Sequence, residues 1–491
     1  MTTPSVIDIL PVDLDQLAGF EGRITVFLPQ DGKLDRGAAR VNRLMKGALA
    51  RFAASEAFGR MKPGEACDLA WPAGMAASAV QVVRLEAKPS VLDLRRAGAA
   101  IGAERGKGDL MVLGGARKGL ADLALGLVLR SYAFTECRTG EAAALATGSI
   151  SVMTSDPEGL RAALGPVTAV AEGVCFTRDL VNLPANRLTT SRFADELAAL
   201  AGLGVEIEVL DEPELEKLGM GMLLGVGQGS ESPSKVVVMQ WKGGGAEAPL
   251  ALVGKGVVFD TGGVSIKPAA GMEEMTMDMG GAGVVAGVMK ALALRGAKAN
   301  VVGLVGLVEN MLDGRAQRPG DIVTSMKGET VEVINTDAEG RLVLGDVMWY
   351  AQERFAPAGM IDLATLTGAV IVALGHENAG VFSNEDGFAG AFLKAATAEG
   401  EGAWRLPLGP GYAELLKSDK ADMKNVGTRW GGAITAAEFL RRFVKEGMPW
   451  IHLDIAGVAQ PAKPPAWAPK GASGWGVMAL DRMIRDHYEA G

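Results

Sequence analysis

The segment Asn335–Leu342, which reads Asn-Thr-Asp-Ala-Glu-Gly-Arg-Leu, constrains this 491-residue chain more than any other. The apolar run Val331–Ile334 in front of it predicts a short buried strand. Leu342–Phe355 behind it has the apolar period of a helix. The octapeptide is therefore expected to lie in a loop between a strand and a helix, where α/β proteins build their sites.

Charged side chains alternate within this octapeptide. A segment that leaves a strand still extended points every second side chain to one side, so we expect Asp337, Glu339 and Arg341 to face one cavity. Two carboxylates and a guanidinium would then share a small volume. Gly340 is expected to allow the tight backbone turn into the following helix.

A second group of charged residues precedes the octapeptide. It begins with Gly254–Gly263, which reads Gly-Lys-Gly-Val-Val-Phe-Asp-Thr-Gly-Gly. Its charged members are Lys255, Asp260, Lys267 and Asp278. Carboxylates that lie close repel each other unless positive charge stands between them, and one arginine cannot neutralise so many. Both groups lie beside glycines at the ends of apolar runs, so the strand ends of an open sheet are expected to bring them together.

These two stretches are similar to the signature regions of the leucyl aminopeptidase family, the cytosol aminopeptidases that carry two metals per active site. The similarity covers the C-terminal two-thirds of the chain, from about Asp179 to about Gly457. It implies a metal-dependent aminopeptidase that releases N-terminal, leucine-like residues from peptides. Thr261 and Val264 depart from the family pattern, where many relatives have Ser and Leu, and both changes leave the charged residues intact.

Carboxylates suit a site for two metals because each has two oxygens that can bridge neighbouring ions. The resemblance implies that Asp260 and Glu339 contact both ions. It also implies that Lys255 and Asp278 complete one site and Asp337 the other. A lysine must be neutral to donate its lone pair, so adjacent dications are expected to lower its pKa from about 10.4. The implied cofactors are two divalent ions per subunit, manganese or zinc, with bicarbonate as a further bound ion.

The resemblance assigns catalytic roles to two basic residues. Lys267, as an ammonium ion, is expected to stabilise the developing oxyanion. Arg341 has a planar fork suited to holding bicarbonate as the general base. An ion pair of Arg341 with Asp337 or Glu339 remains an alternative on the sequence alone.

Four further residues match family positions that shape the pocket for the first side chain of the peptide. They are Met275, Thr365, Leu366 and Gly368. Methionine and glycine leave an adaptable apolar cavity, which favours leucine-like or methionine-like residues. A plain core role remains an alternative for Met275.

The remaining pattern predicts an α/β protein of two domains. Residues 1–165 form a smaller N-terminal α/β domain with an assembly or regulatory role, and residues 166–491 form the catalytic domain. In the second domain, alternating strand and helix patterns predict a mostly parallel central sheet covered by helices. The expected N-terminal elements are strands at 24–28, 80–85 and 110–113 and helices at 38–58, 91–104 and 120–132.

Composition excludes several other classes. The net charge of −9 opposes general nucleic-acid binding. The first 19 residues lack the basic start and apolar run of a signal peptide, and no stretch has the roughly 18 uninterrupted apolar residues of a membrane helix. The 3 cysteines and 3 histidines are scattered, so neither a disulfide framework nor a histidine-based zinc site is expected. We therefore expect a cytoplasmic protein, and the resemblance adds a homo-hexamer.

The sequence disfavours three other interpretations. A DNA-binding or regulatory protein on this scaffold would need a basic groove, which the acidic total disfavours. A dimetal hydrolase of phosphate esters would usually recruit histidines or a basic phosphate loop. The glycines of 224–230 lack the spacing of a nucleotide-binding fingerprint and predict a turn instead.

Overall fold

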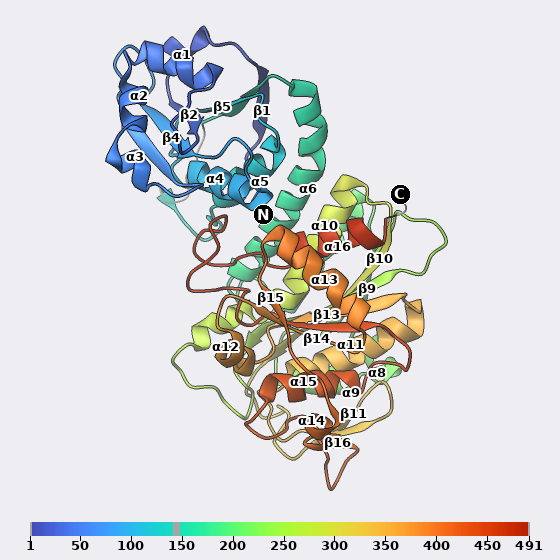
Figure 1. The fold of residues 1–491 in the computed structure, drawn as a ribbon. Coiled ribbons are helices and arrows are strands. Elements are labelled where there is room, and N and C mark those ends of the chain that lie inside the picture. The colour runs from blue at the N-terminus through green and yellow to red at the C-terminus, as the bar shows by residue number, and fades with distance from the viewer. Residues whose placement is uncertain (1, 141–147, 490–491) are drawn as a thin grey trace. The chain divides into compact units, whose positions relative to one another are not determined.

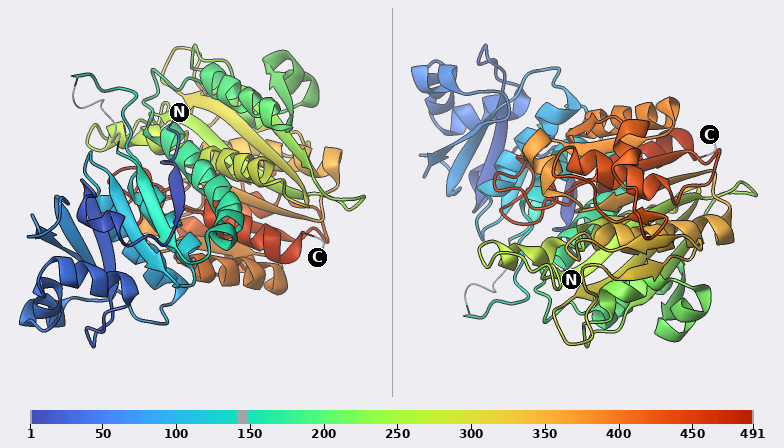
Figure 2. Two further views of the ribbon diagram at one scale, coloured as in Figure 1. Left: turned by 90° about the horizontal axis from the view of Figure 1, so that it is seen from above. Right: turned by 90° about the horizontal axis from the view of Figure 1, so that it is seen from below.

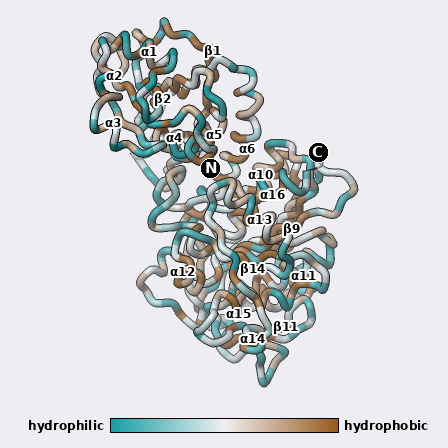
Figure 3. The backbone as a smooth tube through the Cα atoms, viewed as in Figure 1, coloured by the Kyte–Doolittle hydropathy of each residue, from teal (hydrophilic) through white to brown (hydrophobic). Residues whose placement is uncertain are grey.

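The computed structural model describes residues 2–140 and 148–489. The chain divides into two compact units (Figure 1). The first contains residues 1–175 and 464–469, and the second contains residues 176–463 and 470–491. Apolar and polar stretches alternate along the chain in both units (Figure 3).

The first unit is built on a sheet with the strand order β1-β6-β5-β2-β4-β3, in which only β3 pairs antiparallel with its neighbour. The strands are β1 (Ile7–Pro11), β2 (Arg23–Leu28), β3 (Ala66–Ala70), β4 (Ala79–Arg84), β5 (Leu110–Gly115) and β6 (Ile150–Thr154). The helices are α1 (Arg36–Leu44), α2 (Ala48–Ala53), α3 (Glu56–Arg60), α4 (Val91–Ala103) and α5 (Leu120–Arg130), followed by α6 (Pro157–Asn182), which continues into the second unit.

The single helix predicted over 38–58 is wrong, because three short helices occupy this stretch. Lys46 and Gly47 have φ values of +50° and +82°, which end the first helical run in the left-handed region. Ser55 then starts α3 by accepting a hydrogen bond from the Phe58 N–H. The other predicted N-terminal strands and helices lie within one or two residues of those observed.

The second unit contains an eight-stranded sheet with the order β15-β14-β17-β13-β9-β10-β8-β7 (Figures 1 and 2). Its strands are β7 (Glu206–Asp211), β8 (Lys235–Lys242), β9 (Leu250–Asp260), β10 (Asn300–Asn310), β13 (Gly359–Ala364), β14 (Ala379–Ser383), β15 (Ala403–Arg405) and β17 (Trp450–Asp454). The four central strands, β17, β13, β9 and β10, are parallel, and the strands outside them include antiparallel pairs. The mixed α/β fold expected from the sequence is confirmed.

Helices cover this sheet on both faces. The second unit also contains a small three-stranded sheet with the order β11-β12-β16, in which β11 contacts α9. The helices are α7 (Thr190–Ala198), α8 (Glu212–Leu218), α9 (Gly221–Gly227), α10 (Gly280–Arg295), α11 (Gly340–Phe355), α12 (Gly368–Leu374), α13 (Asp386–Glu399), α14 (Pro410–Glu414), α15 (Gly432–Arg441) and α16 (Val477–His487). The small strands are β11 (Ile322–Thr324), β12 (Thr330–Glu332) and β16 (Met423–Lys424). The predicted glycine-rich turn at 224–230 is wrong for its first half, which belongs to α9.

Successive side chains of β9 point alternately toward the two helical layers on the faces of the sheet. Ala251, Val253 and Val257 belong to the buried cluster that includes α11. Gly254, on the opposite face, allows α10 to approach so closely that an added Cβ would lie 2.6 Å from the Ala282 Cα. Lys255 therefore projects toward α11, the helix that follows the charged octapeptide.

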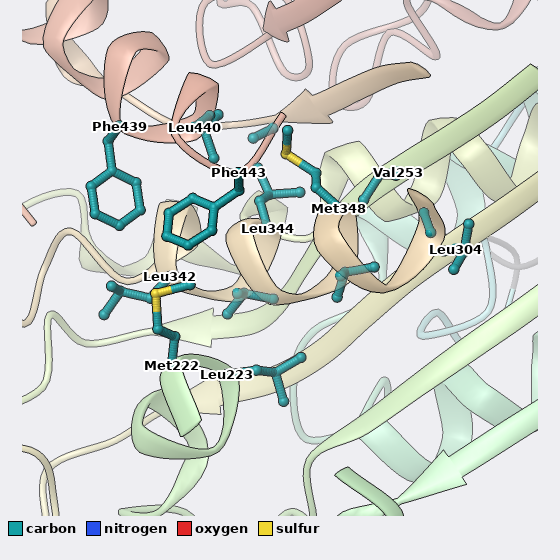
Figure 4. Packing of buried hydrophobic residues seen from close by; sticks show 14 of the residues in the cluster. Met222, Leu223, Val253, Leu304, Leu342, Leu344, Met348, Phe439, Leu440 and Phe443 are labelled. Carbon is teal, nitrogen blue, oxygen red and sulfur yellow. The ribbon is translucent and has the colours of Figure 1, made fainter. Parts of the chain in front are cut away.

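Helix α11 is held in place by apolar packing on several sides. Leu342, Leu344 and Met348 are fully buried and belong to one cluster with residues of α9 and α15 (Figure 4). Burying such side chains contributes roughly 1.5–3 kcal/mol each relative to exposure. The position of the octapeptide at the start of this helix is therefore fixed by the core.

Within residues 2–140 and 148–489, one helical stretch, Met272–Arg295, has the length and apolar composition of a membrane-crossing helix. In its most apolar window, 83% of the residues are buried within the fold. The core helices of globular proteins meet the same criteria, so this segment is weak evidence for a membrane span.

The close packing of α10 on the sheet gives a test of the fold. An added Cβ at Gly281 would lie 2.0 Å from the Leu363 carbonyl oxygen, so Gly281→Ala should lower the free energy of unfolding by about 1–3 kcal/mol. Gly283→Ala is the matched control in the same helix, because its Cβ would meet only side-chain atoms at 3.4 Å or beyond. That variant should stay within about 1 kcal/mol of the parent. Equal changes in urea unfolding of the two variants would contradict this packing.

Candidate active site

A cavity of about 500 Å³ opens at the carboxyl ends of β9 and β13. Its volume is in the range of small-molecule sites. All the residues assigned to the site from the sequence line this cavity: Lys255, Asp260, Lys267, Met275, Asp278, Asp337, Glu339, Arg341, Thr365, Leu366 and Gly368. The carboxyl ends of parallel strands are where open α/β sheets bind ligands.

Strand β9 supplies Asp260 at its last position, and the neighbouring strand β10 supplies a partner that the sequence did not reveal. Asn310 pairs with Asp260 across the two strands and donates from Nδ2 to the Asp260 Oδ1 at 2.7 Å. The backbone N–H of Gly262 donates to the same oxygen at 2.9 Å. Both bonds fix the orientation of the Asp260 carboxylate. The only hint in the sequence was the position of Asn310 at the end of a buried apolar run.

The sequence predicted an extended octapeptide, and this prediction is wrong. The segment forms a turn before the helix. The Asn335 side chain accepts a hydrogen bond from the Asp337 N–H at 2.9 Å, and the backbone carbonyl oxygen of Asn335 accepts one from the Ala338 N–H at 3.2 Å. Glu339 already has helical φ and ψ values of −80° and −37°. Asp337, Glu339 and Arg341 nevertheless all line the cavity, because the turn and the first helical residues replace the strand-like alternation.

Gly340 has a role other than the one predicted. It is the first residue of α11 and is not among the residues with positive φ in the described chain. An added Cβ would lie 2.5 Å from the Lys255 Cε. Glycine is needed here because the Lys255 side chain passes directly against the helix backbone.

Two lysines join the carboxylates of the cavity in pairs. Lys255 Nζ lies 2.7 Å from Asp278 Oδ1 and 2.8 Å from Glu339 Oε1. Lys267 Nζ lies 2.7 Å from Asp260 Oδ2 and 2.5 Å from Asp337 Oδ1. Two positive charges thus face four carboxylates, which leaves these six groups with an excess of two negative charges when all are ionised. The Arg341 guanidinium, which also lines the cavity, reduces the excess to one.

Burial and mutual repulsion perturb the pKa values of these groups. Burial alone would lower the pKa of Lys255, but the neighbouring carboxylates, with Asp278 first, outweigh it and raise the pKa. The pKa of Lys267 is raised in the same way, chiefly by Asp260 against the effect of burial. Burial raises the pKa of Asp278, although Lys255 opposes this effect. The lysines are therefore held as ammonium ions, and the carboxylates favour additional positive charge.

The donor set fits divalent cations. Carboxylate oxygens of Asp260, Asp337 and Glu339 lie within 4.8 Å of one another. Among the described residues, Asp278 Oδ2 and Glu339 Oε2 are buried and have no hydrogen-bond partner. Buried carboxylate oxygens are costly unless they are paired or coordinate a metal. Donation by Lys255 to a metal requires loss of its proton, which a nearby dication favours.

Arg341 stands apart from these ion pairs. Its side chain is buried, with the residue 6% exposed, and burial lowers its pKa to about 10 although Glu339 and Asp454 oppose the shift. Its Nη1 donates to the Asn425 carbonyl oxygen at 2.9 Å, whereas Nε has no partner within the described part of the chain. Over the same residues, Arg341 forms no ion pair with Asp337 or Glu339, so that alternative is wrong. The guanidinium remains available to an anion in the cavity.

The loop after β13 forms another wall of the cavity. Thr365 donates from its hydroxyl to Asp278 at 2.9 Å, and its carbonyl oxygen accepts from Lys255 at 3.0 Å. On its other side, buried Asp454 accepts from the Leu366 N–H at 3.1 Å and from the Thr367 hydroxyl at 2.7 Å. Leu366 is thereby held between the charged cluster and β17.

Met275 is only partly buried and lies in a 3₁₀ helix, Met272–Met277, at the edge of the cavity. A role confined to the core is thus wrong for this residue. An added Cβ at Gly368 would meet no atom within 4 Å, which leaves open space beside Leu366.

Comparisons with a family model, with related sequences and with solved structures all indicate the same family. Residues 175–480 match the model of the cytosol aminopeptidase family, catalytic domain. The chain is 62% identical to a probable cytosol aminopeptidase of Dinoroseobacter shibae over 489 residues, covering 100% of both chains. It is 48% identical to one from Caulobacter vibrioides, covering 98% of this chain and 99% of the relative.

Solved structures share the fold over nearly the whole length. A tomato leucine aminopeptidase variant has a TM-score of 0.85 and 31% identity, with 99% of this chain and 97% of that chain covered. The bottromycin maturation enzyme BotP, solved in complex with Mn, has a TM-score of 0.82 and 34% identity, with 95% and 99% covered. The similarity thus includes the first 165 residues, where sequence motifs gave no match.

The excess negative charge predicts stabilisation by divalent cations. Adding Mn²⁺ to chelated protein at about 1,000 times its dissociation constant should raise the free energy of unfolding by about 4 kcal/mol. Glu339→Gln should remove most of this gain, because it deletes a charge from the cluster. Glu353→Gln, on the outer part of the same helix, is the matched control. Equal metal-induced stabilisation of both variants in thermal unfolding would contradict the assignment of the cation site.

Proposed function

The chain belongs to the cytosol aminopeptidase family, whose members are metal-dependent hydrolases of the leucyl aminopeptidase type, and on this premise we propose that it releases leucine-like residues from peptide N-termini. One observation carries the proposal: four carboxylates and two lysines meet in a single cavity with buried oxygens left unpaired. An acidic, partly buried site suits both metal ions and the free α-amine of a peptide.

We assign the metal ligands as the family pattern suggests. Asp260 and Glu339 would contact both ions, Lys255 and Asp278 would complete one site, and Asp337 would complete the other. When bound, two divalent ions supply Lewis acidity toward the scissile carbonyl and make hydroxide available near neutral pH. Manganese is favoured by the Mn complex of BotP, and zinc remains the other candidate.

The protein's own residues supply charge and proton transfer around the scissile bond. Lys267, an ammonium ion already positioned by Asp260 and Asp337, would donate a hydrogen bond to the oxygen that becomes negative in the transition state. Arg341 would hold bicarbonate by its planar fork, and the bicarbonate would accept the proton of the attacking water. The absence of an ion pair to Arg341 among the described residues supports this role.

The preference for leucine-like residues rests on the apolar side of the cavity. Met275 and Leu366 contribute apolar side chains to the lining, and an added Cβ at Gly368, which also lines the cavity, would meet no atom within 4 Å. Thr365 positions the wall through its bond to Asp278. A flexible thioether adapts to unbranched and branched side chains, which suits leucine and methionine.

We further propose a homo-hexamer that works in the cytoplasm, as the resemblance implied. The large exposed side chains of Val372, Trp404 and Trp430, with 90%, 62% and 71% exposure, support contacts with other subunits. The name of the relatives, cytosol aminopeptidase, supports the location. For residues 1–165 we retain an assembly or regulatory role.

Hydrolysis of leucine p-nitroanilide tests the proposed activity. We expect activity that is lost on chelation, restored by Mn²⁺ or Zn²⁺, and absent with the N-acetylated substrate, because the blocked amine can no longer enter the acidic site. Full activity in the presence of chelator, or on the blocked substrate, would exclude a metallo-aminopeptidase.

A lysine substitution at Arg341 separates the effect of the planar guanidinium from that of the positive charge. Arg341→Lys keeps the positive charge but loses the planar fork, so kcat should fall by about 100-fold and any acceleration by added bicarbonate should disappear. Arg441→Lys, on the exposed part of α15, is the control and should retain both. Unchanged bicarbonate dependence in Arg341→Lys would show that another group holds the base.

A further inference from the structure

Asn425 forms four hydrogen bonds with residues of the octapeptide, although it was not assigned to the site. It directly follows β16, the strand that pairs in parallel with β12 before the octapeptide. Its side chain is completely buried, with 0% exposure. We infer that Asn425 is a positioning residue that sets the conformation of 334–341 and thereby the geometry of the metal ligands in it. This inference rests on the proposed function of that segment.

The carboxamide of Asn425 uses both its acceptor and its donor capacity. Its Oδ1 accepts from the backbone N–H groups of Ile334 at 2.8 Å and Asn335 at 3.3 Å. Its Nδ2 donates to the carbonyl oxygens of Asn335 at 2.7 Å and Ala338 at 3.4 Å. One side chain thus bridges the two ends of the turn that carries Asp337.

The backbone of Asn425 extends the same connection. Its carbonyl oxygen accepts from Arg341 at 2.9 Å, and its N–H donates to the Glu332 carbonyl oxygen at 3.0 Å. Asn425 therefore contacts the strand before the turn, the turn itself and the first turn of α11. A loop with these buried backbone groups unpaired would lose much of its order.

Asparagine is the appropriate residue for this position. Aspartate could accept the two N–H bonds but could not donate to the two carbonyl oxygens. An apolar side chain could neither accept nor donate these hydrogen bonds. Because the position is fully buried, bulk water could not take over the lost bonds. The identity of Asn425 thus matters for the loop, although the residue does not line the cavity.

A control residue lies at the other end of the same strand pair, β12 and β16. Asp422, just before β16, accepts from the Thr330 N–H at 2.8 Å and from the Thr330 hydroxyl at 2.9 Å. It connects the same two segments but at the start of β12, away from the octapeptide. Asp422→Ala removes two side-chain hydrogen bonds between these segments, at an exposed position, without touching the turn.

The test measures Mn²⁺ affinity by equilibrium dialysis on the full chain. We expect Asn425→Ala to weaken Mn²⁺ binding by about 10–100-fold, in the range found for residues that orient metal ligands. Asp422→Ala should stay within about threefold of the parent. Amide hydrogen exchange should accelerate at 334–338 in the first variant only, and kcat should fall more than KM rises.

Two further variants separate the possible failures. If Asn425→Ala does not fold by near-UV circular dichroism, Asn425→Ser, which keeps one donor and one acceptor, replaces it with the same expectation. Mn²⁺ binding of the Asn425 variant equal to that of Asp422→Ala would overturn the positioning role. Equal Mn²⁺ binding by the parent and Glu339→Gln would instead overturn the proposed metal site, on which the inference rests.

Discussion

The compensation of buried charge between β9 and the octapeptide is the interaction on which this structure depends. Lys255 and Lys267 each connect two carboxylates, and the excess negative charge gives the cavity its affinity for cations. Such a cluster is stable only if the charged groups approach closely. Gly340 permits this approach by exposing the backbone of α11 to the Lys255 side chain.

The hydrogen-bonding and the charged residues divide the work of building the site. The side chains of Asn310, Asn425 and Thr365 carry no charge themselves, and their hydrogen bonds fix the Asp260 and Asp278 carboxylates and the octapeptide loop. Carboxylate oxygens that these bonds do not use, among them Asp278 Oδ2 and Glu339 Oε2, remain available to a ligand. The apolar packing of α11 also fixes the charged residues at its start, because the helix cannot shift without disrupting the buried cluster.

Most of the predicted strands and helices of the first unit, apart from the single helix over 38–58, follow from local signals of apolar alternation. The residues assigned to the site followed from an unusual charged motif and from the family resemblance that it carries, and all of them line the cavity. The sequence prediction misjudged the shape of the octapeptide, since the Asn335 side chain creates a turn that strand periodicity does not reveal. Asn425 was missed because its partners in 334–341 lie 84–91 residues away in the chain. Such contacts follow from the fold and leave no local pattern.

Anomalous diffraction from crystals soaked with Mn²⁺ tests the cation site most directly. We expect two strong peaks in the cavity, one near Lys255 and Asp278 and one near Asp337, with Asp260 and Glu339 beside both. Peaks only elsewhere in the molecule, or none in this cavity from a protein that binds Mn²⁺ in solution, would contradict the proposed metal site.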